Sequence, residues 1–415
     1  MAALTSLTGV RRLTNICWGL RTIRAVKLEF PNNRGLHSCD SCRLCGSGTH
    51  HFLGQKRTVL LRKHASWSSA RLSRQWKRGY TTAESDPSTR EQTQPHKLIE
   101  SELQSLHPSI REELSTASPE LNEVSQYYFD GKGKSVRPMI VLLMSRVCNI
   151  HNSISDRILE PQRQIAMIAE MIHTASLMHD DVIDAADTRR GKMSINELFG
   201  QRKSILAGDF VLSISSQALA RIGDPDVVIV LSNVIEDLVR GEFMQLGAKD
   251  NENERFSHYF LKTYKKTASL MAHSCRAVAM LSGSSRDVCE IAYQYGRNIG
   301  MAFQLIDDIL DFVSSDDTLG KPTSADLKLG LATAPVLFAA EKFPELNDMI
   351  MRRFSAPGDV EKAREAVANT DSIRQSRFLA EQHSREAQRQ IERLTDSPER
   401  RALVYLTQEV LSRQK

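Results

Sequence analysis

Apolar residues recur at every third or fourth position through most of residues 95–415, and no stretch alternates apolar and polar residues as a half-buried strand does. The pattern therefore predicts an all-α fold without strands. A first helix is expected near residues 98–106, and Pro108 is expected to open a second. A third should start at Pro119 and end at Phe129. Further helices are expected over residues 139–148, 158–183, 193–221, 225–247, 255–282, 286–313, 330–341, 345–353, 359–369, 373–394 and 398–413.

The helices expected between residues 158 and 313 are apolar over more than the narrow stripe that a surface helix buries. They are therefore expected to form the walls of a helical bundle. Two of them, 158–183 and 286–313, end in clusters of acidic residues, and charged loops follow at 185–192 and 314–326. These two helix ends are the first candidates for a functional site.

Three aspartates close the first of these helices: Asp180, Asp181 and Asp184. A helix turns about 100° per residue, so Asp180 and Asp184 lie about 40° apart on one face. Converging carboxylates repel one another unless a cation lies between them, and oxygen ligands favour a hard ion such as Mg²⁺. A second triad closes the other helix at Asp307, Asp308 and Asp311. A solvated helix end or a capping cluster would explain one triad alone. Two triads, each preceded by an apolar helical run, favour a shared, metal-bound substrate.

Magnesium held by protein carboxylates normally completes its shell with water and substrate phosphates, so a phosphorylated substrate is expected. Side chains that can grip a second anion flank the triads. They are Lys132, Lys134 and Arg137 in a Gly/Lys turn, and Arg189 and Arg190 after the first triad. Two phosphate pockets are therefore predicted, with the apolar helices receiving the hydrophobic part of the substrate. A solvated turn explains Lys132 equally well.

Charge is divided unevenly along the chain. Residues 1–80 hold 15 Lys and Arg against two acidic residues, whereas the rest holds 40 basic and 48 acidic residues. The leader is rich in Arg, Ser and Leu, which is typical of a mitochondrial transit peptide, so a matrix location is expected. Residues 81–94 are expected to be a linker and residues 95–415 the folded domain. The folded part is net acidic, which argues against nucleic-acid binding, and no run of 18 apolar residues predicts a membrane span.

Four of the seven cysteines lie in the leader. Cys39, Cys42 and Cys45 have a spacing that can bind zinc, but a zinc site needs a folded scaffold that this segment does not suggest, so a discarded presequence is the simpler interpretation. The other three stand singly in apolar helices and are expected to be buried, reduced thiols: Cys148, Cys275 and Cys289.

Six short motifs occur along the folded part. They are Gly133-Lys134-Ser-Val-Arg137-Pro138, His173 ahead of Asp180-Asp181-x-x-Asp184, Arg189-Arg190-Gly191, Lys266-Thr267-Ala268, Phe303-Gln304-x-x-Asp307-Asp308-x-x-Asp311 and Gly320-Lys321-Pro322. In this order and combination they resemble the trans-polyprenyl diphosphate synthases, over residues 95–415. The resemblance implies an isoprenoid-synthase fold, a helical bundle around a central active-site cavity.

The resemblance also implies a role for each motif residue. Mg²⁺ ions that bridge an allylic diphosphate would be bound by Asp180, Asp184, Asp307 and Asp311, with Asp181 and Asp308 in support. The same diphosphate would be held by Arg189, Lys266, Thr267, Gln304 and Lys321. Isopentenyl diphosphate would be held opposite by Lys134, Arg137, His173 and Arg190. Taken alone, His173 on its apolar helix would more simply be a core histidine with one hydrogen bond.

The implied activity is the repeated condensation of isopentenyl diphosphate onto an allylic diphosphate, such as farnesyl or geranylgeranyl diphosphate. The implied product is a long all-trans polyprenyl diphosphate, nona- or decaprenyl, for the ubiquinone side chain. The resemblance further implies a hetero-oligomer with a second, homologous subunit, and peripheral membrane contact for release of the product.

Product length should depend on the side chains one to two turns before the first triad. Ala175 and Ser176 are small there, and Met171 is flexible, which favours a long product. The chain departs from many short-chain members at Leu331, where a lysine is common; Leu331 cannot donate to phosphate.

Three alternatives remain open from the residues. A metal-dependent phosphohydrolase would need more histidines and has no use for a second triad. A terpene cyclase or a squalene-type synthase would lack the anion site of the Gly/Lys turn. A non-catalytic, scaffolding subunit of a prenyltransferase would be expected to have lost aspartates, and here all six are present.

Overall fold

The computed structural model describes residues 94–131, 133, 135–246, 252–313 and 324–413, so the expectations for the leader, most of the linker, Lys132, Lys134 and Lys321 lie outside the described residues. The all-α prediction is confirmed. The helices are α4 Pro95–Leu98, α5 Glu100–Glu113, α6 Pro119–Gln126, α7 Val136–His151, α8 Glu160–Ile183, α9 Ile195–Phe199, α10 Gln201–Ile222, α11 Pro225–Leu246, α12 Glu252–Thr263, the π-helical turn η1 Tyr264–Ala268, α13 Ser269–Leu281, α14 Arg286–Val313, α16 Ala325–Lys328, α17 Ala334–Ala340, α18 Leu346–Met351, α19 Asp359–Ala368, α20 Ser372–Ile391 and α21 Pro398–Ser412.

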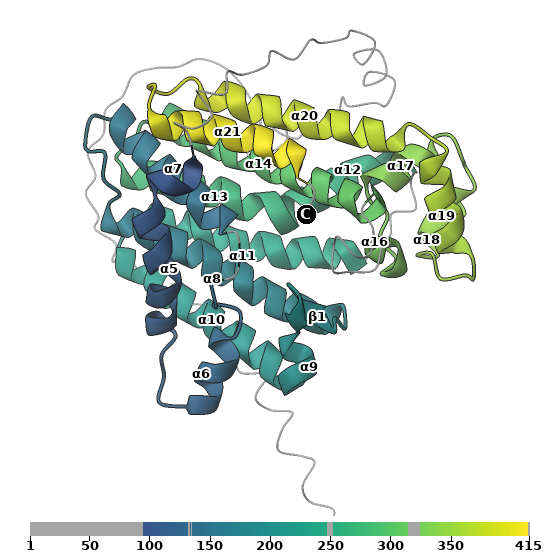
Figure 1. Ribbon diagram of the computed structural model, residues 1–415, viewed down its shortest axis with the longest axis horizontal. Coiled ribbons are helices and arrows are strands. Elements are labelled where there is room, and N and C mark those ends of the chain that lie inside the picture. The colour runs from purple at the N-terminus through teal and green to yellow at the C-terminus, as the bar shows by residue number, and fades with distance from the viewer. Residues whose placement is uncertain (1–93, 132, 134, 247–251, 314–323, 414–415) are drawn as a thin grey trace, which may run out of the picture. The chain divides into compact units, whose positions relative to one another are not determined.

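The long helices pack side by side as the walls of a bundle, as their apolar surfaces predicted (Figure 1). α13 contacts α7, α8, α11 and α14, and α14 is covered on its other side by α20 and α21. α8 lies between α7 and α10. The two helices that end in aspartate triads, α8 and α14, therefore both contact α13, which fixes the two triads relative to each other.

Two glycines bring α14 unusually close to α13 and η1. A Cβ added at Gly296 would lie 2.5 Å from the carbonyl oxygen of Met271, and one added at Gly300 would lie 2.6 Å from the Cα of Ala268. Because real side chains do not tolerate such contacts with backbone, only glycine allows this helix spacing.

Three predicted boundaries were wrong for identifiable reasons. Pro108 lies inside α5 and does not open a helix. Pro108 has no backbone N–H to donate to the carbonyl oxygen of Gln104, four residues earlier. Both residues are exposed, so water can donate to that carbonyl instead. The helix expected over 193–221 is broken at Gly200, whose φ is +82°. The helix expected over 330–341 starts only at Ala334, after Gly330 with φ +78°.

A short hairpin was also missed. β1 Thr188–Arg189 pairs antiparallel with β2 Lys192–Met193, within the loop that follows the first triad. Arg190 and Gly191 form its turn with φ values of +52° and +77°, as type I′ turns require. Strands of two residues are too short for an alternating pattern to reveal.

The predicted buried thiols are confirmed, since Cys148, Cys275 and Cys289 are free and buried. Burial raises the pKa of all three thiols.

The sequence predicted no membrane-spanning helix. By length and composition alone, however, α10 could cross a membrane. One such helix is weak evidence, since core helices of soluble proteins pass the same test. One side of α10 packs on α8, with Ala207, Gly208 and Val211 buried.

Candidate active site

The middle aspartate of the first triad points into the protein. Asp181 is fully buried and accepts hydrogen bonds from the Tyr128 hydroxyl at 2.5 Å and from Nε and Nη2 of Arg189 at 2.8 and 2.5 Å. The Tyr128 oxygen in turn accepts the backbone N–H of Ile195, at the start of α9. Asp181 therefore anchors the hairpin and α9 to the end of α8, which is a supporting role.

The outer aspartates of the first triad face a different environment. Burial raises the pKa of Asp180 to about 6; nearby Lys266 lowers it, whereas Glu242 and Asp184 raise it. Asp180, Asp184 and Glu242 thus bring negative charge into one partly buried volume. Glu242, on α11, was not predicted from the sequence.

The second triad repeats the arrangement of the first. Asp308 is buried, and it accepts hydrogen bonds from the Tyr259 hydroxyl at 2.5 Å and from Nε2 of Gln304 at 2.9 Å. Asp307 lies towards the site and accepts from Nη1 of Arg413 at 2.8 Å. Burial raises the pKa of Asp307 to about 6, although Arg413 lowers it.

The third aspartate of this triad caps a helix. The carboxylate of Asp311 accepts the backbone N–H groups of Ala325 and Asp326, at 3.0 and 3.3 Å, at the start of α16. Its predicted role as a metal ligand stays a prediction.

A row of polar side chains connects the two triads. Lys266 pairs with Glu242 and donates to Oε1 of Gln245 at 3.2 Å. Its neighbour Thr267 donates to Oε1 of Gln304 at 2.8 Å, and Gln304 donates to Asp308. Lys266 and Thr267 lie in the π-helical turn η1, a feature often found at functional sites.

The predicted isopentenyl diphosphate residues that the structure describes also gather in one place. Nη1 of Arg137 donates to Nε2 of His173 at 2.9 Å. Arg190 reaches the same region, because its Nη1 would lie 3.0 Å from a Cβ added at Gly133. Desolvation and the positive charges of Arg137, Arg190 and Arg189 hold the pKa of His173 well below its ordinary value. His173 is therefore neutral at pH 7 and can offer a hydrogen bond but no charge.

Further residues of this pocket were not predicted. Glu170 is buried one turn before His173, and its negative charge favours the charged form of Arg137. The Arg137 guanidinium lies 5.9 Å from the centre of the Phe303 ring, and that of Arg413 lies 3.9 Å from it.

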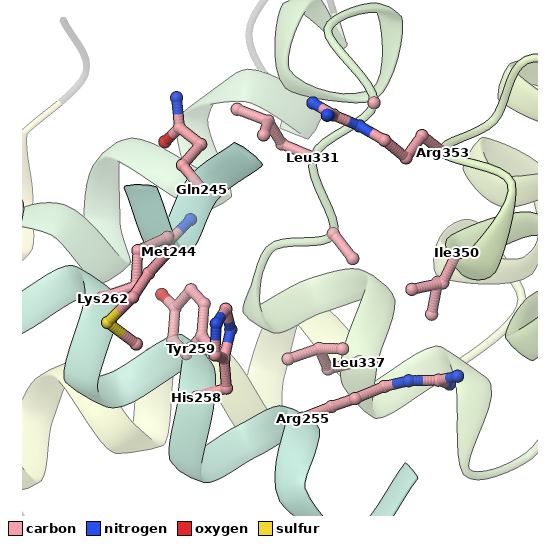
Figure 2. Close-up of a pocket in the computed structure, with 12 residues that line it drawn as sticks. Met244, Gln245, Arg255, His258, Tyr259, Lys262, Leu331, Leu337, Ile350 and Arg353 are labelled. Carbon is pink, nitrogen blue, oxygen red and sulfur yellow. The ribbon is translucent and has the colours of Figure 1, made fainter. Parts of the chain in front are cut away.

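A cavity of about 70 Å³ lies beside Asp308, lined by its partner Tyr259. Figure 2 shows His258, Tyr259 and Lys262 of α12 on one side of this cavity and Leu331 and Arg353 across from them. Leu331, where many short-chain members have a lysine, therefore contributes an apolar side chain to this cavity. The lysine that lines the cavity is Lys262, from α12.

The predicted chain-length residues lie on α8 before the first triad. Ala175 is fully buried, and Ser176 is partly buried and donates to the carbonyl oxygen of His173 at 2.8 Å. Met171 is fully buried as well. A small side chain at 175 is therefore enclosed by the bundle, and its effect on product length stays a prediction.

The outer carboxylates are oxygen donors, which suit a hard divalent cation. Within the described part of the chain, no three His, Cys, Asp or Glu side chains are arranged to enclose an ion by themselves. Mg²⁺ usually takes one or two carboxylates and completes its shell with water and phosphate. Burial, with smaller contributions from Glu242 and Asp184, raises the pKa of Asp180, and a cation bound beside it would favour the ionised carboxylate.

The sequence profile of the family described as "Polyprenyl synthetase" matches residues 118–367. The human "All trans-polyprenyl-diphosphate synthase PDSS1" is 56% identical over 364 residues, which cover 88% of each chain. Decaprenyl-diphosphate synthase subunit 1 of Schizosaccharomyces pombe is 46% identical over 343 residues, covering 77% of this chain and 91% of the relative. The chain belongs to the polyprenyl synthetase family.

Solved structures agree with the fold. The polyprenyl synthase from Caulobacter crescentus CB15, complexed with calcium and isoprenyl diphosphate, has a TM-score of 0.70 and 27% identity, covering 77% of this chain and 97% of that one. The heptaprenyl diphosphate synthase from Staphylococcus aureus has a TM-score of 0.71 and 31% identity, with coverages of 76% and 99%. The isoprenoid-synthase fold is thereby confirmed.

The particular enzyme class follows from the same relatives. They are long-chain all-trans polyprenyl diphosphate synthases, and they confirm the class predicted from the motifs, a trans-polyprenyl diphosphate synthase. The resemblance extends to one particular protein of this class, subunit 1 of decaprenyl-diphosphate synthase, through the fission yeast relative.

Proposed function

We propose that this chain elongates an allylic diphosphate, farnesyl or geranylgeranyl, by repeated condensation with isopentenyl diphosphate. One observation supports the site assignment. Lys266 is close enough to Asp180 to lower its pKa, its neighbour Thr267 is linked through Gln304 to Asp308, and Arg137 of the Arg137–His173 pair interacts electrostatically with Asp307. The allylic diphosphate lies between the triads, and isopentenyl diphosphate lies at the arginine–histidine pair.

Four aspartates hold the metal in this proposal: Asp180, Asp184, Asp307 and Asp311. These carboxylates would hold Mg²⁺, which would supply neutralisation of the diphosphate charge as the leaving group departs. Arg189, Lys266, Thr267, Gln304 and Lys321 orient that diphosphate. Lys134, Arg137, His173 and Arg190 hold the second diphosphate, with His173 contributing a hydrogen bond.

The reaction breaks the bond between the allylic carbon and the diphosphate oxygen, so pyrophosphate leaves with the electron pair. The double bond of isopentenyl diphosphate forms the new carbon–carbon bond, and loss of a proton restores an alkene. Bundle walls of apolar helices exclude water, which would otherwise convert the allylic cation to an alcohol.

The product is a long all-trans chain, nona- or decaprenyl diphosphate, for the ubiquinone side chain. The small side chains of Ala175 and Ser176 do not obstruct growth of the chain past the first triad as a bulky aromatic residue would. A mitochondrial location follows from the leader composition and from relatives named as mitochondrial in Oryza sativa and Neurospora crassa. The growing tail leaves towards a membrane surface or the partner subunit.

The partner is a second, homologous subunit, which covers an exposed apolar face on α10 and α11. Exposed apolar surface of this kind marks interaction sites. The two helices contact each other, and Leu206 and Phe243 are 63% and 72% exposed. The remaining exposed apolar side chains of this face are Ile205, Ile229, Val239 and Leu246.

The interface is tested by copurification of the Phe243→Glu variant with partners from mitochondria. Loss of a homologous subunit is expected, whereas Met351→Glu, at an exposed site on α18, should retain it. Retention by both variants would refute this face as the interface.

The activity is tested by incubating the purified chain with Mg²⁺, an allylic diphosphate and labelled isopentenyl diphosphate, alone and with candidate partners. Label should enter long-chain lipid in at least one combination, and Asp180→Asn should abolish it. If the complex stays active with Asp180→Asn, the chain is the scaffolding subunit that forms the alternative.

A further inference from the structure

The last described residue of the chain lies in the active site. Arg413 follows α21 directly, and its Nη1 donates to Oδ1 of Asp307 at 2.8 Å. Its guanidinium also lies 3.9 Å from the centre of the Phe303 ring. The Arg413 side chain is only 19% exposed. A cation thus already pairs with an aspartate that belongs to the second triad.

The position of Arg413 is set by the packing of α21. The Tyr295 hydroxyl of α14 donates to the carbonyl oxygen of Leu403 at 2.8 Å, and Ser384 of α20 donates to that of Thr407 at 2.6 Å. Two residues before Arg413, the carbonyl oxygen of Leu411 accepts a hydrogen bond from Nη1 of Arg377, on α20, at 3.1 Å. α21 is therefore held along its length, which directs its last residue to Asp307.

We propose that Arg413 is an internal counter-cation for the second triad, which a metal ion must displace from Asp307. The proposal rests on the proposed metal role of Asp307. A free metal ion gains the Asp307 carboxylate only by breaking the Arg413 pair. A metal–diphosphate complex brings its own phosphate oxygens, which can accept hydrogen bonds from the displaced guanidinium of Arg413. The arrangement therefore favours loading of metal together with a diphosphate over loading of metal alone.

The expected size of the effect follows from the exposure of the pair. Exposed ion pairs contribute little and buried ones more, and this pair is intermediate, with side chains 19% and 36% exposed. Removing the guanidinium should therefore tighten metal binding at this site by about two- to tenfold without diphosphate.

The test measures Mn²⁺ binding by the EPR signal of free Mn²⁺, on the full chain and on Arg413→Gln, with and without inorganic pyrophosphate. Each signal is compared with that of the same solution without protein, because pyrophosphate itself binds Mn²⁺. Arg413→Gln should bind Mn²⁺ more tightly than the parent chain without pyrophosphate, and the difference should shrink when pyrophosphate is present. Arg413→Lys, which keeps the charge, should restore the weaker binding. Arg401→Gln removes an equal charge from α21 itself, at an exposed side chain that pairs with Asp396, and should bind as the parent does.

Equal or weaker Mn²⁺ binding by Arg413→Gln would overturn the proposal, provided that circular dichroism and Tm show a folded protein. If the parent chain binds no Mn²⁺ even with pyrophosphate, the proposed metal function itself fails. The two failures are thus distinguishable, and neither readout depends on turnover.

Discussion

Replacing Gly300 with Ala should push α14 away from the π-helical turn that carries Lys266 and Thr267. The added Cβ would lie 2.6 Å from the Cα of Ala268 and 2.9 Å from its Cβ. Carbon atoms pack at about 3.5–4.0 Å, so the two backbones must separate by about 1 Å. Gln304 lies one turn further along α14, and its 2.8 Å hydrogen bond from Thr267 would then exceed hydrogen-bonding distance.

Two opposing terms decide the stability of this variant. Overpacking of a core costs about 1–3 kcal/mol, whereas Ala is favoured over Gly inside a helix by about 1 kcal/mol. The net loss is thus about 0–2 kcal/mol, which lowers Tm by only a few degrees in a domain of this size. Misplacement by about 1 Å, however, can cost a hundredfold in rate. We therefore expect kcat/KM for the allylic substrate to fall about ten- to a hundredfold in a protein that remains folded.

The assay combines a thermal melt with steady-state kinetics in which each diphosphate is varied in turn. Gln294→Ala is the matched control, because Gln294 is on the same helix and its side-chain amide donates only to exposed Glu290. The control should keep both Tm and kcat/KM. Wild-type kinetics and Tm for Gly300→Ala would refute the argument that glycine sets the distance between α14 and η1.

Three further outcomes are expected. Tyr259→Phe removes one hydrogen-bond donor from the buried Asp308 carboxylate, which should cost about 1.5–3 kcal/mol in denaturant unfolding; an unchanged midpoint would contradict the role of that hydroxyl. The pKa of Asp180 is raised to about 6, so without metal its ionised form destabilises the fold, and stability should rise as pH falls from about 7 towards 4. Asp180→Asn should be the more stable protein at pH 7.5 by about 1–3 kcal/mol. Urea titrations at several pH values should show that it loses the part of the pH response due to Asp180, while the part due to Asp307, whose pKa is also raised to about 6, remains. Ala175→Phe should shorten the product distribution, and identical chain lengths by chromatography would disprove the role of position 175.

The long helices and the triads could be predicted from the sequence because both signals are local. Helical period over 20 or more residues defines α8 and α14, and four-residue spacing places Asp180 and Asp184 on one face. The motif order then specified the enzyme class. Boundaries were less accurate where one exposed residue decides them, as at Pro108.

The partners of the triads could not be predicted, because they are contacts between distant helices. Tyr128 is 53 residues from Asp181, and Arg413 is 106 residues from Asp307. Tyrosine in an apolar context signals burial but not which carboxylate its hydroxyl meets. Glu242 belongs to no motif and follows a glycine on an apolar helix, so the sequence does not mark it. The packing of α11 on η1 brings its carboxylate to Lys266.

The two triads use their middle aspartates alike, and helix geometry explains why. Adjacent residues differ by about 100° in direction, so when the first aspartate faces the site, the second must face a neighbouring element. A buried carboxylate needs donors, and each middle aspartate has a tyrosine hydroxyl at 2.5 Å, Tyr128 from before α7 and Tyr259 from α12. Because these tyrosines come from unrelated segments, the repeated arrangement follows from the spacing of the motif itself. At both D-D-x-x-D helix ends the middle aspartate is therefore an anchoring carboxylate while the first faces the site, and substitutions of the middle residue should first be measured as changes in stability.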